Sequence, residues 1–250
     1  MNPEPRFYRT GMGISRFESF EINYKDSNLW IGIDKKSFNP IIPFFALKKL
    51  TDTREILEDY IQREPEFKSS LEPIKLLPEA PGIALVMAVA SKKAGTGPMA
   101  AVAGAFAEYI GKAICEEFKV KEIVVENGGD IWMNIDNDIL ISIYAGNSPF
   151  SGKISVEVKA AFSPLSICTS AGKIGPSFSF GNADAVMVAC KDAALADALA
   201  TAIGNKIKQA ADIDIQQNDY KNFNEILSLI IICEDKIGVS GKFKIKPSNQ

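Results

Sequence analysis

The 250-residue sequence contains no histidine. Histidine is the usual general base near neutral pH, the usual partner of a nucleophilic serine or cysteine, and the commonest ligand of transition metals. A Ser-His-Asp triad is therefore excluded, and any proton transfer falls to a carboxylate, lysine, tyrosine or cysteine. A bound metal would be a hard cation that prefers oxygen ligands, such as Mg²⁺.

Cysteine is scarce, and the 4 that occur lie far apart without a Cys-x-x-Cys pair. They predict neither a zinc site nor a disulfide framework, and most are expected in the core. The sequence also lacks an apolar run of about 18 residues, and its N-terminus lacks the apolar segment of a signal peptide. We therefore expect a cytoplasmic protein without a membrane partner.

A basic surface for nucleic acid is missing as well. The 28 Lys and Arg residues are interspersed with 31 Asp and Glu residues, for a formal net charge of −3. No Lys/Arg run is combined with aromatic residues, so the sequence has no electrostatic footprint for nucleic acid. We expect a small-molecule ligand, and a protein partner and a homo-oligomer stay open.

A glycine-bearing turn precedes a helix of mostly small residues. Gly95, Thr96 and Gly97 are followed by Pro98, which suits a first helical position, and the helix is expected to reach about Phe118. The N–H groups at such a helix start could bind a phosphate or carboxylate, or the turn could simply cap a buried helix. Small residues recur along one face, which predicts close packing on a neighbour: Ala100, Gly104, Ala107 and Gly111.

Prolines interrupt the pattern between Pro65 and Pro81. This stretch predicts a connection between an N-terminal part, 1–64, and a motif-bearing part, 82–250. The apolar run from Ile83 to Ala90 favours a helix, because it is rich in alanine and Gly95 could end it. The N-terminal part is expected to hold a strand pair and a helix that starts at Thr51 or Thr53.

A tight turn, Asn127-Gly128-Gly129-Asp130, separates two expected strands at 121–126 and 131–135. Strands at 139–145 and 154–160 are expected to extend the same antiparallel sheet. Asn-Gly turns usually close hairpins, yet two glycines and a carboxylate at a strand end also suit close approach to a ligand. Both interpretations of Gly128, Gly129 and Asp130 stay open.

The polar stretch from Ser166 to Asp184 has neither helical nor strand periodicity, so it is expected to be a loop, which at this length is often functional. It contains Thr169 and Ser170. An alanine-rich helix from Ala193 to Asn205 carries Asp197 and Thr201 one turn apart on one face. That pair could share one hard cation, or it could belong to a solvent-facing stripe with Asn205 and Lys208.

Four stretches together resemble the ApbE-like superfamily, and most closely its cytoplasmic branch, whose activity is not established. The likeness extends over roughly residues 80 to 205, and the stretches are specific when they occur in this order. They are Gly97–Ala105, Val125–Ile131, Cys168–Ser170 and Ala196–Ala202.

The best-known members of this superfamily are flavin transferases, which bind FAD with Mg²⁺ and attach FMN to a threonine or serine of a target protein. The resemblance implies that Asp197 and Thr201 are Mg²⁺ ligands. It also implies that the Gly-Gly-Asp turn and the Thr-Ser stretch belong to the ligand site, namely Gly128, Gly129, Asp130, Thr169 and Ser170.

One departure concerns the transfer reaction. Those transferases carry a His-x-x-Asp-Pro stretch after the Thr-Ser segment, where this sequence has Phe178 to Asp184 and no histidine. Ser170 is followed by Ala171-Gly172 rather than directly by glycine. The resemblance therefore leaves open whether the chain is an enzyme.

Three functions remain. The first is a protein that binds an anionic or nucleotide-like molecule, such as FAD, together with Mg²⁺. The second is an active FAD:protein FMN transferase in which Asp184, Lys173 or Cys168 replaces the histidine. The third is a non-enzymatic scaffold; the branch is associated with homocysteine formation, which suggests a link to sulfur metabolism.

For the architecture we expect an α+β fold. A largely antiparallel sheet packs against the alanine- and glycine-rich helices in a single ApbE-like domain over residues 1–250, with 65–81 as an internal connection. Alanine-rich faces allow the helices that begin at Pro98 and Ala193 to approach each other closely.

Overall fold

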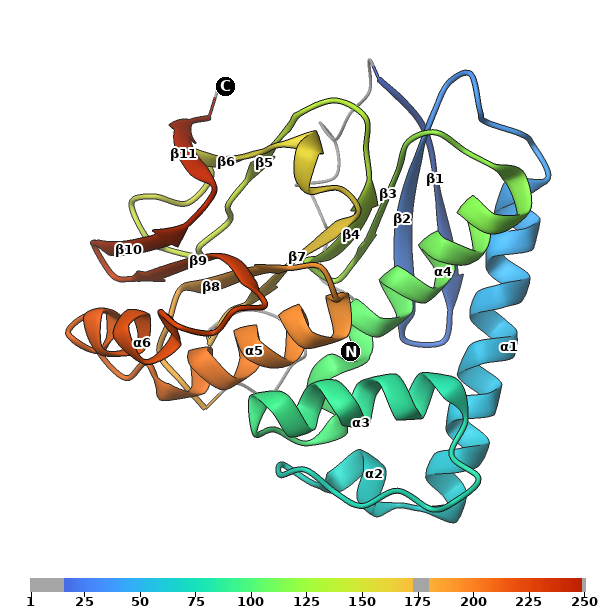
Figure 1. Cartoon of the computed structure of the whole chain (residues 1–250), viewed down its shortest axis with the longest axis horizontal. Helices are drawn as coiled ribbons and strands as arrows, with labels where there is room; N and C mark the ends of the chain where they lie inside the picture. Colours follow the sequence, from blue (N-terminus) through green and yellow to red (C-terminus); the bar gives the residue numbers. More distant parts are fainter. Residues whose placement is uncertain (1–15, 173–179, 249–250) are drawn as a thin grey trace.

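A computed structural model describes residues 16–172 and 180–248 (Figure 1). Its largest element is an eight-stranded sheet in the order β1-β2-β3-β4-β7-β8-β9-β10, in which each neighbouring pair is antiparallel. The strands are β1 Phe17–Tyr24, β2 Ser27–Asp34, β3 Ile123–Asn127, β4 Asp130–Asn134, β7 Leu165–Ser170, β8 Ala185–Cys190, β9 Ile226–Cys233 and β10 Lys236–Gly241.

A second, three-stranded sheet corrects one expectation. It consists of β11 (Lys244–Pro247), β6 (Ile154–Val158) and β5 (Ile139–Ser142), all antiparallel. The strands expected at 139–145 and 154–160 therefore do not extend the sheet of β3 and β4. Their apolar residues, such as Val156 and Val158, instead cover one face of the large sheet and form a hydrophobic core with it.

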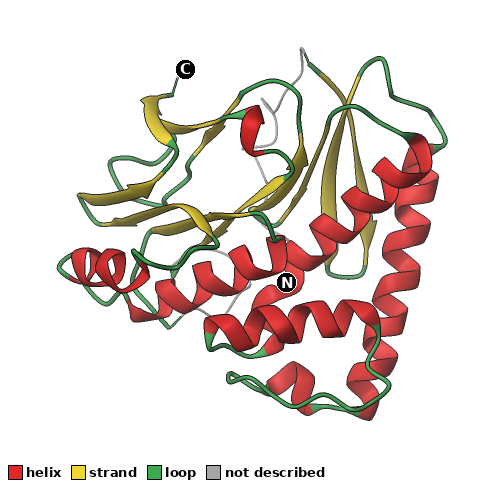
Figure 2. Cartoon of the chain, viewed as in Figure 1, coloured by secondary structure: helices red, strands yellow, loops and turns green. Residues whose placement is uncertain are grey.

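The helices gather on the opposite face of the large sheet (Figure 2). None of those in the described ranges is long and apolar enough to cross a membrane. They are α1 Ile42–Arg63, α2 Glu66–Ser69, α3 Gly82–Ala94, α4 Val102–Phe118, α5 Ala193–Lys206 and α6 Asp212–Tyr220, with the 3-10 turn η2 Pro98–Ala101. Another 3-10 turn, η3 Ala160–Phe162, packs against the core shared with the small sheet.

Side-chain alternation in the strands separates the two cores. In β8, Val186 and Val188 belong to the core under the helices, whereas Ala185 and Met187 belong to the core under the small sheet. Successive side chains of a strand point to opposite faces, so one strand can serve both cores. All six residues of β8 are buried, as expected for a strand covered on both faces.

Helix α1 begins earlier than the sequence predicts. It starts at Ile42 rather than at Thr51 or Thr53, because Asn39 accepts a hydrogen bond from the Ile41 N–H (3.0 Å) and a proline occupies the first turn. The Thr53 hydroxyl donates to the Lys49 carbonyl (2.7 Å) in the middle of the helix. A threonine that could have capped a helix thus bonds to the preceding turn.

The stretch around α3 follows the prediction closely. The expected helix over Ile83–Ala90 is part of α3, and Gly95 ends it with φ +73°. The connection 65–81 contains no regular element except the short helix α2. In the sequence, β2 precedes this connection and β3 follows it, yet the two strands pair directly in the large sheet.

The stretch expected to be a loop is partly a strand. Residues 166–170 belong to β7, in the middle of the large sheet, so that part of the prediction is wrong. Thr169 and Ser170 are polar, but they pair with Met187 and Val186 of β8. Lys173 and the rest of 173–179 lie outside the described residues. Helix α6 and strand β10 were not predicted from the sequence.

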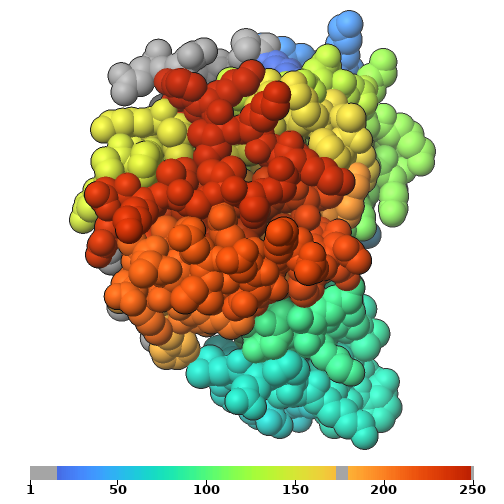
Figure 3. Space-filling view, turned by 60° about the vertical axis from the view of Figure 1, so that its left-hand side comes forward, coloured from blue at the N-terminus to red at the C-terminus, as the bar shows by residue number. Residues whose placement is uncertain are grey.

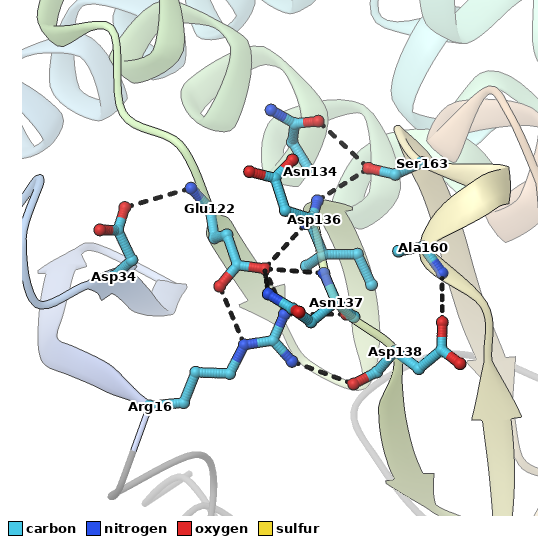
Figure 4. Close-up of polar contacts among 10 residues, drawn as sticks. Arg16, Asp34, Glu122, Asn134, Asp136, Asn137, Asp138, Ala160 and Ser163 are labelled. Carbon is cyan, nitrogen blue, oxygen red and sulfur yellow. Dashed lines mark hydrogen bonds and ion pairs between the residues drawn. The ribbon is translucent and has the colours of Figure 1, made fainter.

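A polar network fixes the end of the hairpin of β3 and β4 that lies away from its turn (Figure 4). Glu122 is buried, and one of its oxygens accepts hydrogen bonds from the N–H groups of Asp136 (2.7 Å) and Asn137 (3.0 Å). The guanidinium of Arg16 pairs with the same carboxylate. Burial raises the pKa of Glu122, but these donors outweigh it and bring the pKa to about 2.

Candidate functional site

Four segments meet around two carboxylates, those of Asp130 and Asp197. They are the turn between β3 and β4, the end of β7, the first turn of α4 and the first two turns of α5. Each of the four stretches singled out in the sequence therefore contributes to one place. Gly128 is exposed, and Asp197 and Thr169 are half-buried, so the cluster reaches the surface.

The turn between β3 and β4 needs its glycines. Gly128 has φ +68° and Gly129 has φ +103°, conformations that other residues rarely adopt. The buried Glu126 accepts a hydrogen bond from the Gly129 N–H (2.7 Å), and the Asn127 amide donates to the Ala103 carbonyl (3.1 Å). These bonds hold the turn against the start of α4 and place Asp130 at the first position of β4.

Asp130 is a buried carboxylate in an unfavourable environment. It is 6% exposed and accepts a hydrogen bond from the Thr169 N–H (3.2 Å). Burial raises its pKa well above the usual range, and the charges of Asp197 and Glu126 raise it further, although hydrogen bonds from Cys168 and Thr169 oppose this. The group therefore favours a proton or a nearby cation.

Asp197 belongs to α5, and its carboxylate lies at the N-terminus of the neighbouring helix α4. Its carboxylate accepts a hydrogen bond from the Gly104 N–H (3.0 Å), and the N–H of Ala103 also stabilises its charge. Burial is the larger effect, and it raises the pKa of Asp197 to about 7. Of the two interpretations made from the sequence, the solvent-facing stripe does not describe this residue, because its carboxylate bonds to another helix.

The glycine at position 104 lets α4 and α5 approach this closely. A Cβ at Gly104 would lie 2.3 Å from the Ala193 carbonyl oxygen and 3.0 Å from the Cβ of Asp197. The two helices are also capped by each other, because Glu108 of α4 accepts a hydrogen bond from the Ala193 N–H (2.7 Å). Each helix thus supplies a carboxylate to the N-terminus of the other.

Cys168 completes the buried part of the cluster. Its thiol is fully buried and lies 3.5 Å from the Ala193 carbonyl oxygen, to which it donates. Burial raises its pKa well above the usual range, and the charges of Asp130 and Asp197 add to this effect. A thiol in this environment stays protonated near neutral pH, which makes it a poor nucleophile and a poor base.

Among the described residues, no cationic side chain neutralises the pair of Asp130 and Asp197. None of the main contributions to the pKa of Asp130 or Asp197 comes from a lysine or arginine, and neither residue forms a salt bridge within the described chain. The described residues contain no group of three or more His, Cys, Asp or Glu side chains arranged to hold a metal ion. A cation here would thus have two carboxylates plus hydroxyl, carbonyl or ligand oxygens, a donor set that suits Mg²⁺.

The other predicted site residues differ in their surroundings. Ser170 ends β7 directly after Thr169, and Thr201 lies one turn after Asp197; both are half-buried. Within the described chain, Thr201 forms no hydrogen bond with Asp130 or Asp197. Its role as a metal ligand therefore stays a prediction.

The turn Gly95–Gly97 has local structural contacts. Gly95 ends α3, and a Cβ at Gly97 would lie 1.8 Å from the Ser70 carbonyl oxygen, so this glycine is required by the connection packed on it. Thr96 is 6% exposed, and its hydroxyl has no hydrogen-bond partner in the described ranges. A ligand role for these three residues stays a prediction.

Sequence reasoning missed Glu126, Asn127 and Glu108 as parts of this site. Glu126 had a usable signal, because a carboxylate directly after the apolar run Ile123–Val125 is expensive to bury without partners. Glu108 lies one turn after Gly104 on α4. Its partner, the Ala193 N–H, is 85 positions away in the chain, and periodicity cannot reveal such a contact.

Comparison with known sequences gives a consistent result. A family model described as AbpE bacteria matches residues 12–225. A UPF0280 protein of Methanococcus vannielii is 39% identical over 228 residues, which cover 90% of this chain and 90% of the relative. A UPF0280 protein of Methanocaldococcus jannaschii is 36% identical over 223 residues, with 87% and 88% covered.

Comparison with solved structures agrees at the level of the fold. The ApbE protein of Thermotoga maritima has a TM-score of 0.58 at 12% identity, covering 90% of this chain and 97% of that one. The apo form of the Pseudomonas stutzeri flavinyl transferase ApbE has a TM-score of 0.51 at 12% identity, covering 90% and 94%. At such low identity, the likeness concerns the fold alone.

Proposed function

Because the chain belongs to the AbpE bacteria family within the ApbE-like superfamily, we propose that it binds an anionic, nucleotide-like molecule together with Mg²⁺ at Asp130 and Asp197. FAD is the ligand to test first, because a solved neighbour is named a flavinyl transferase. One observation carries the proposal: the buried carboxylate of Asp130 and the half-buried carboxylate of Asp197 interact electrostatically and lack a cationic partner in the described chain.

The charges explain why a metal would be needed. A phosphate placed beside Asp130 and Asp197 would be repelled by both when they are ionised. Mg²⁺ binds through carboxylates and substrate phosphates while keeping some of its waters, so it can turn this repulsion into attraction. Asp197 and Asp130 would hold the ion, and Thr201 or water would complete its shell. When bound, the ion would supply charge neutralisation for the ligand's phosphates.

Several residues would hold the ligand rather than the ion. The exposed Gly128 and the half-buried Gly129 have no side chain to block a close approach to the backbone of the turn. Thr169 and Ser170 lie at the end of β7 beside this turn and supply hydroxyl groups. These groups are suited to an extended ligand with both phosphate and polar ring atoms.

The structure gives FMN transfer less support than binding. Of the three residues that could replace the histidine, Asp184 accepts a hydrogen bond from the Glu234 N–H (2.6 Å), which ties it to the turn between β9 and β10. Cys168 is held as a neutral thiol by burial. Lys173 lies outside the described residues. We therefore propose ligand binding without transfer of FMN.

Calorimetric titration with FAD, with and without Mg²⁺, tests this proposal. We expect micromolar binding, which corresponds to about −8 kcal/mol, in the presence of Mg²⁺ only. Asp197→Asn keeps an oxygen for the Gly104 N–H but removes the charge, so it is expected to weaken binding at least tenfold without unfolding the protein. The control is Asp59→Asn, on the exposed face of α1.

Two results would contradict the proposal. One is FAD binding of equal strength with and without Mg²⁺. The other is unchanged affinity in Asp197→Asn. Covalent FMN on a threonine-containing target, formed when the protein is mixed with FAD and Mg²⁺, would contradict the absence of transfer alone.

A further inference from the structure

The region formed by α2, the connection 70–81 and α3 projects from the body of the protein, and we call it the α3 ledge (residues 66–94). In Figure 3 it extends below the C-terminal part of the chain. The connection starts beside Gly97, just after α3, and ends where α3 begins, so it runs back along this helix (Figure 1). The ledge thus has an outer surface of its own.

This surface is unusually apolar. Of the 15 large hydrophobic side chains that the described residues leave exposed, 5 lie between positions 71 and 89. Three of the five, Leu85, Val86 and Val89, lie on α3, where their spacing forms one helix face. This face is opposite the one formed by the buried residues of the helix, which include Ile83, Ala84, Met87 and Ala90. The five exposed residues are Leu71 (65% exposed), Leu77 (42%), Leu85 (49%), Val86 (46%) and Val89 (58%). An exposed apolar helix face, such as the one that Leu85, Val86 and Val89 form on α3, indicates an interaction site.

Charged side chains lie near the two ends of α3. Glu79 lies in the turn before α3, with a side chain that is 87% exposed and only a 3.8 Å ion pair to Arg63. Lys92 is exposed on the last turn and has no ion pair within the described chain, whereas Lys93 pairs with Glu225 (3.1 Å). The face is therefore acidic at its start, apolar in the middle and basic at its end.

We propose that the α3 ledge is the interface of a homodimer, in which the α3 helices of two copies pack antiparallel about a two-fold axis. An axis at the level of Met87 places Lys92 of one copy level with Gly82 of the other, beside its Glu79. Leu85 of one copy then lies level with Val89 of the other, and Val86 lies close to the axis. A two-fold interface must be self-complementary, and opposite charges at the two ends of one apolar helix face meet that requirement.

A second copy fits this face better than other partners do. Both ends of the face are matched only by a surface with the reversed charge order, and an antiparallel copy of α3 has that order. An anionic lipid surface would be repelled by Glu79, and an unrelated helix has no reason to carry this order. The interface would be modest in size, so the dimer is expected to depend on concentration in the micromolar range.

Sedimentation of the full chain between about 1 and 100 µM tests the assembly. We expect a species of twice the 27.2 kDa chain mass to form as concentration rises. Val89→Glu places a charge in the centre of the interface and is expected to leave the protein monomeric. Phe44→Glu is the matched control, because Phe44 is 74% exposed on α1, and it is expected to dimerise like the wild type.

A charge-reversal pair tests the antiparallel arrangement. Lys92→Glu and Glu79→Lys are each expected to raise the dimer dissociation constant at least tenfold, and the double variant is expected to restore it. Both residues are exposed, so neither change should affect folding. A wild type that stays monomeric at 100 µM, a Val89→Glu variant that still dimerises, or a double variant no tighter than the single ones would each overturn the proposal.

Discussion

Replacing Gly104 by alanine should separate α4 from α5. The new Cβ would lie 2.3 Å from the Ala193 carbonyl oxygen, while ordinary contact begins at 3.4 Å, so the helices must move apart by about 1 Å. Such a shift would also lengthen the 3.0 Å bond between the Gly104 N–H and Asp197 beyond hydrogen-bond range. Overpacking costs about 1–3 kcal/mol, and a lost helix cap costs about 1 kcal/mol.

Alanine's higher helix propensity offsets about 1 kcal/mol of this cost. We therefore expect Gly104→Ala to lower the free energy of unfolding by about 2 kcal/mol, or Tm by about 4–8 °C for a chain of this size. Urea unfolding followed by circular dichroism measures the first quantity. The control is Gly82→Ala, since a Cβ at Gly82 would meet nothing within 4 Å. A Gly104→Ala variant as stable as the wild type would refute the close-packing argument.

Two further predictions concern the carboxylates of Glu122, which is buried, and Glu108, which is half-buried. The pKa of Glu122 in the folded state is about 2, below its usual value, so its stabilising effect is complete above pH 4.5 and is lost as the pH falls toward 2. Acid unfolding should show this loss of stability. Its upper limit is about 3 kcal/mol, and the actual loss should be smaller because Arg16 is partly exposed. Glu122→Gln should remove this pH dependence. Glu108→Ala should lower the free energy of unfolding by about 1 kcal/mol, because it removes the acceptor for the Ala193 N–H. The control, Lys112→Ala, breaks only the ion pair to Glu108 and should lower it by less than about 0.5 kcal/mol. Urea unfolding measures both values.

Local signals predicted much of the fold. The antiparallel α+β architecture, the helix after Pro81, the strand pair around Gly128-Gly129 and the alanine-rich helix after Asp192 are confirmed. Asp192 caps α5 by accepting a hydrogen bond from the Leu195 N–H (2.9 Å). The four motifs also led to the ApbE-like family that the family model supports. These features depend on residues close together in the sequence.

The errors arose where distant segments decide the outcome. The strands β5 and β6 were predicted, but a local pattern does not show which sheet a strand joins, and the pairing of β6 with Lys244–Pro247 decides this. β7 looked like a loop because Thr169 and Ser170 are polar, yet its pairing with β4 and β8 makes it a strand. Tertiary pairing overrides local propensity in such cases.

The candidate site was predicted only in part, because it also depends on contacts between segments that are distant in the sequence. Helical spacing showed that Asp197 and Thr201 share a face, and composition singled out Asp130. Neither could show that the N-terminus of α4 would meet Asp197 at Gly104, because 93 positions separate these residues. The acid pair itself follows from that contact and from the bond between Asp130 and the Thr169 N–H.

The mutual capping of α4 and α5 has a consequence for how the molecule opens. Each N-terminus has an N–H group whose acceptor is on the other helix, since Asp197 accepts from the Gly104 N–H and Glu108 accepts from the Ala193 N–H. The two helices should therefore unfold as one cooperative unit rather than fray separately. In native-state hydrogen exchange, the amides of Gly104 and Ala193 would exchange with the same opening free energy, although they belong to different motifs.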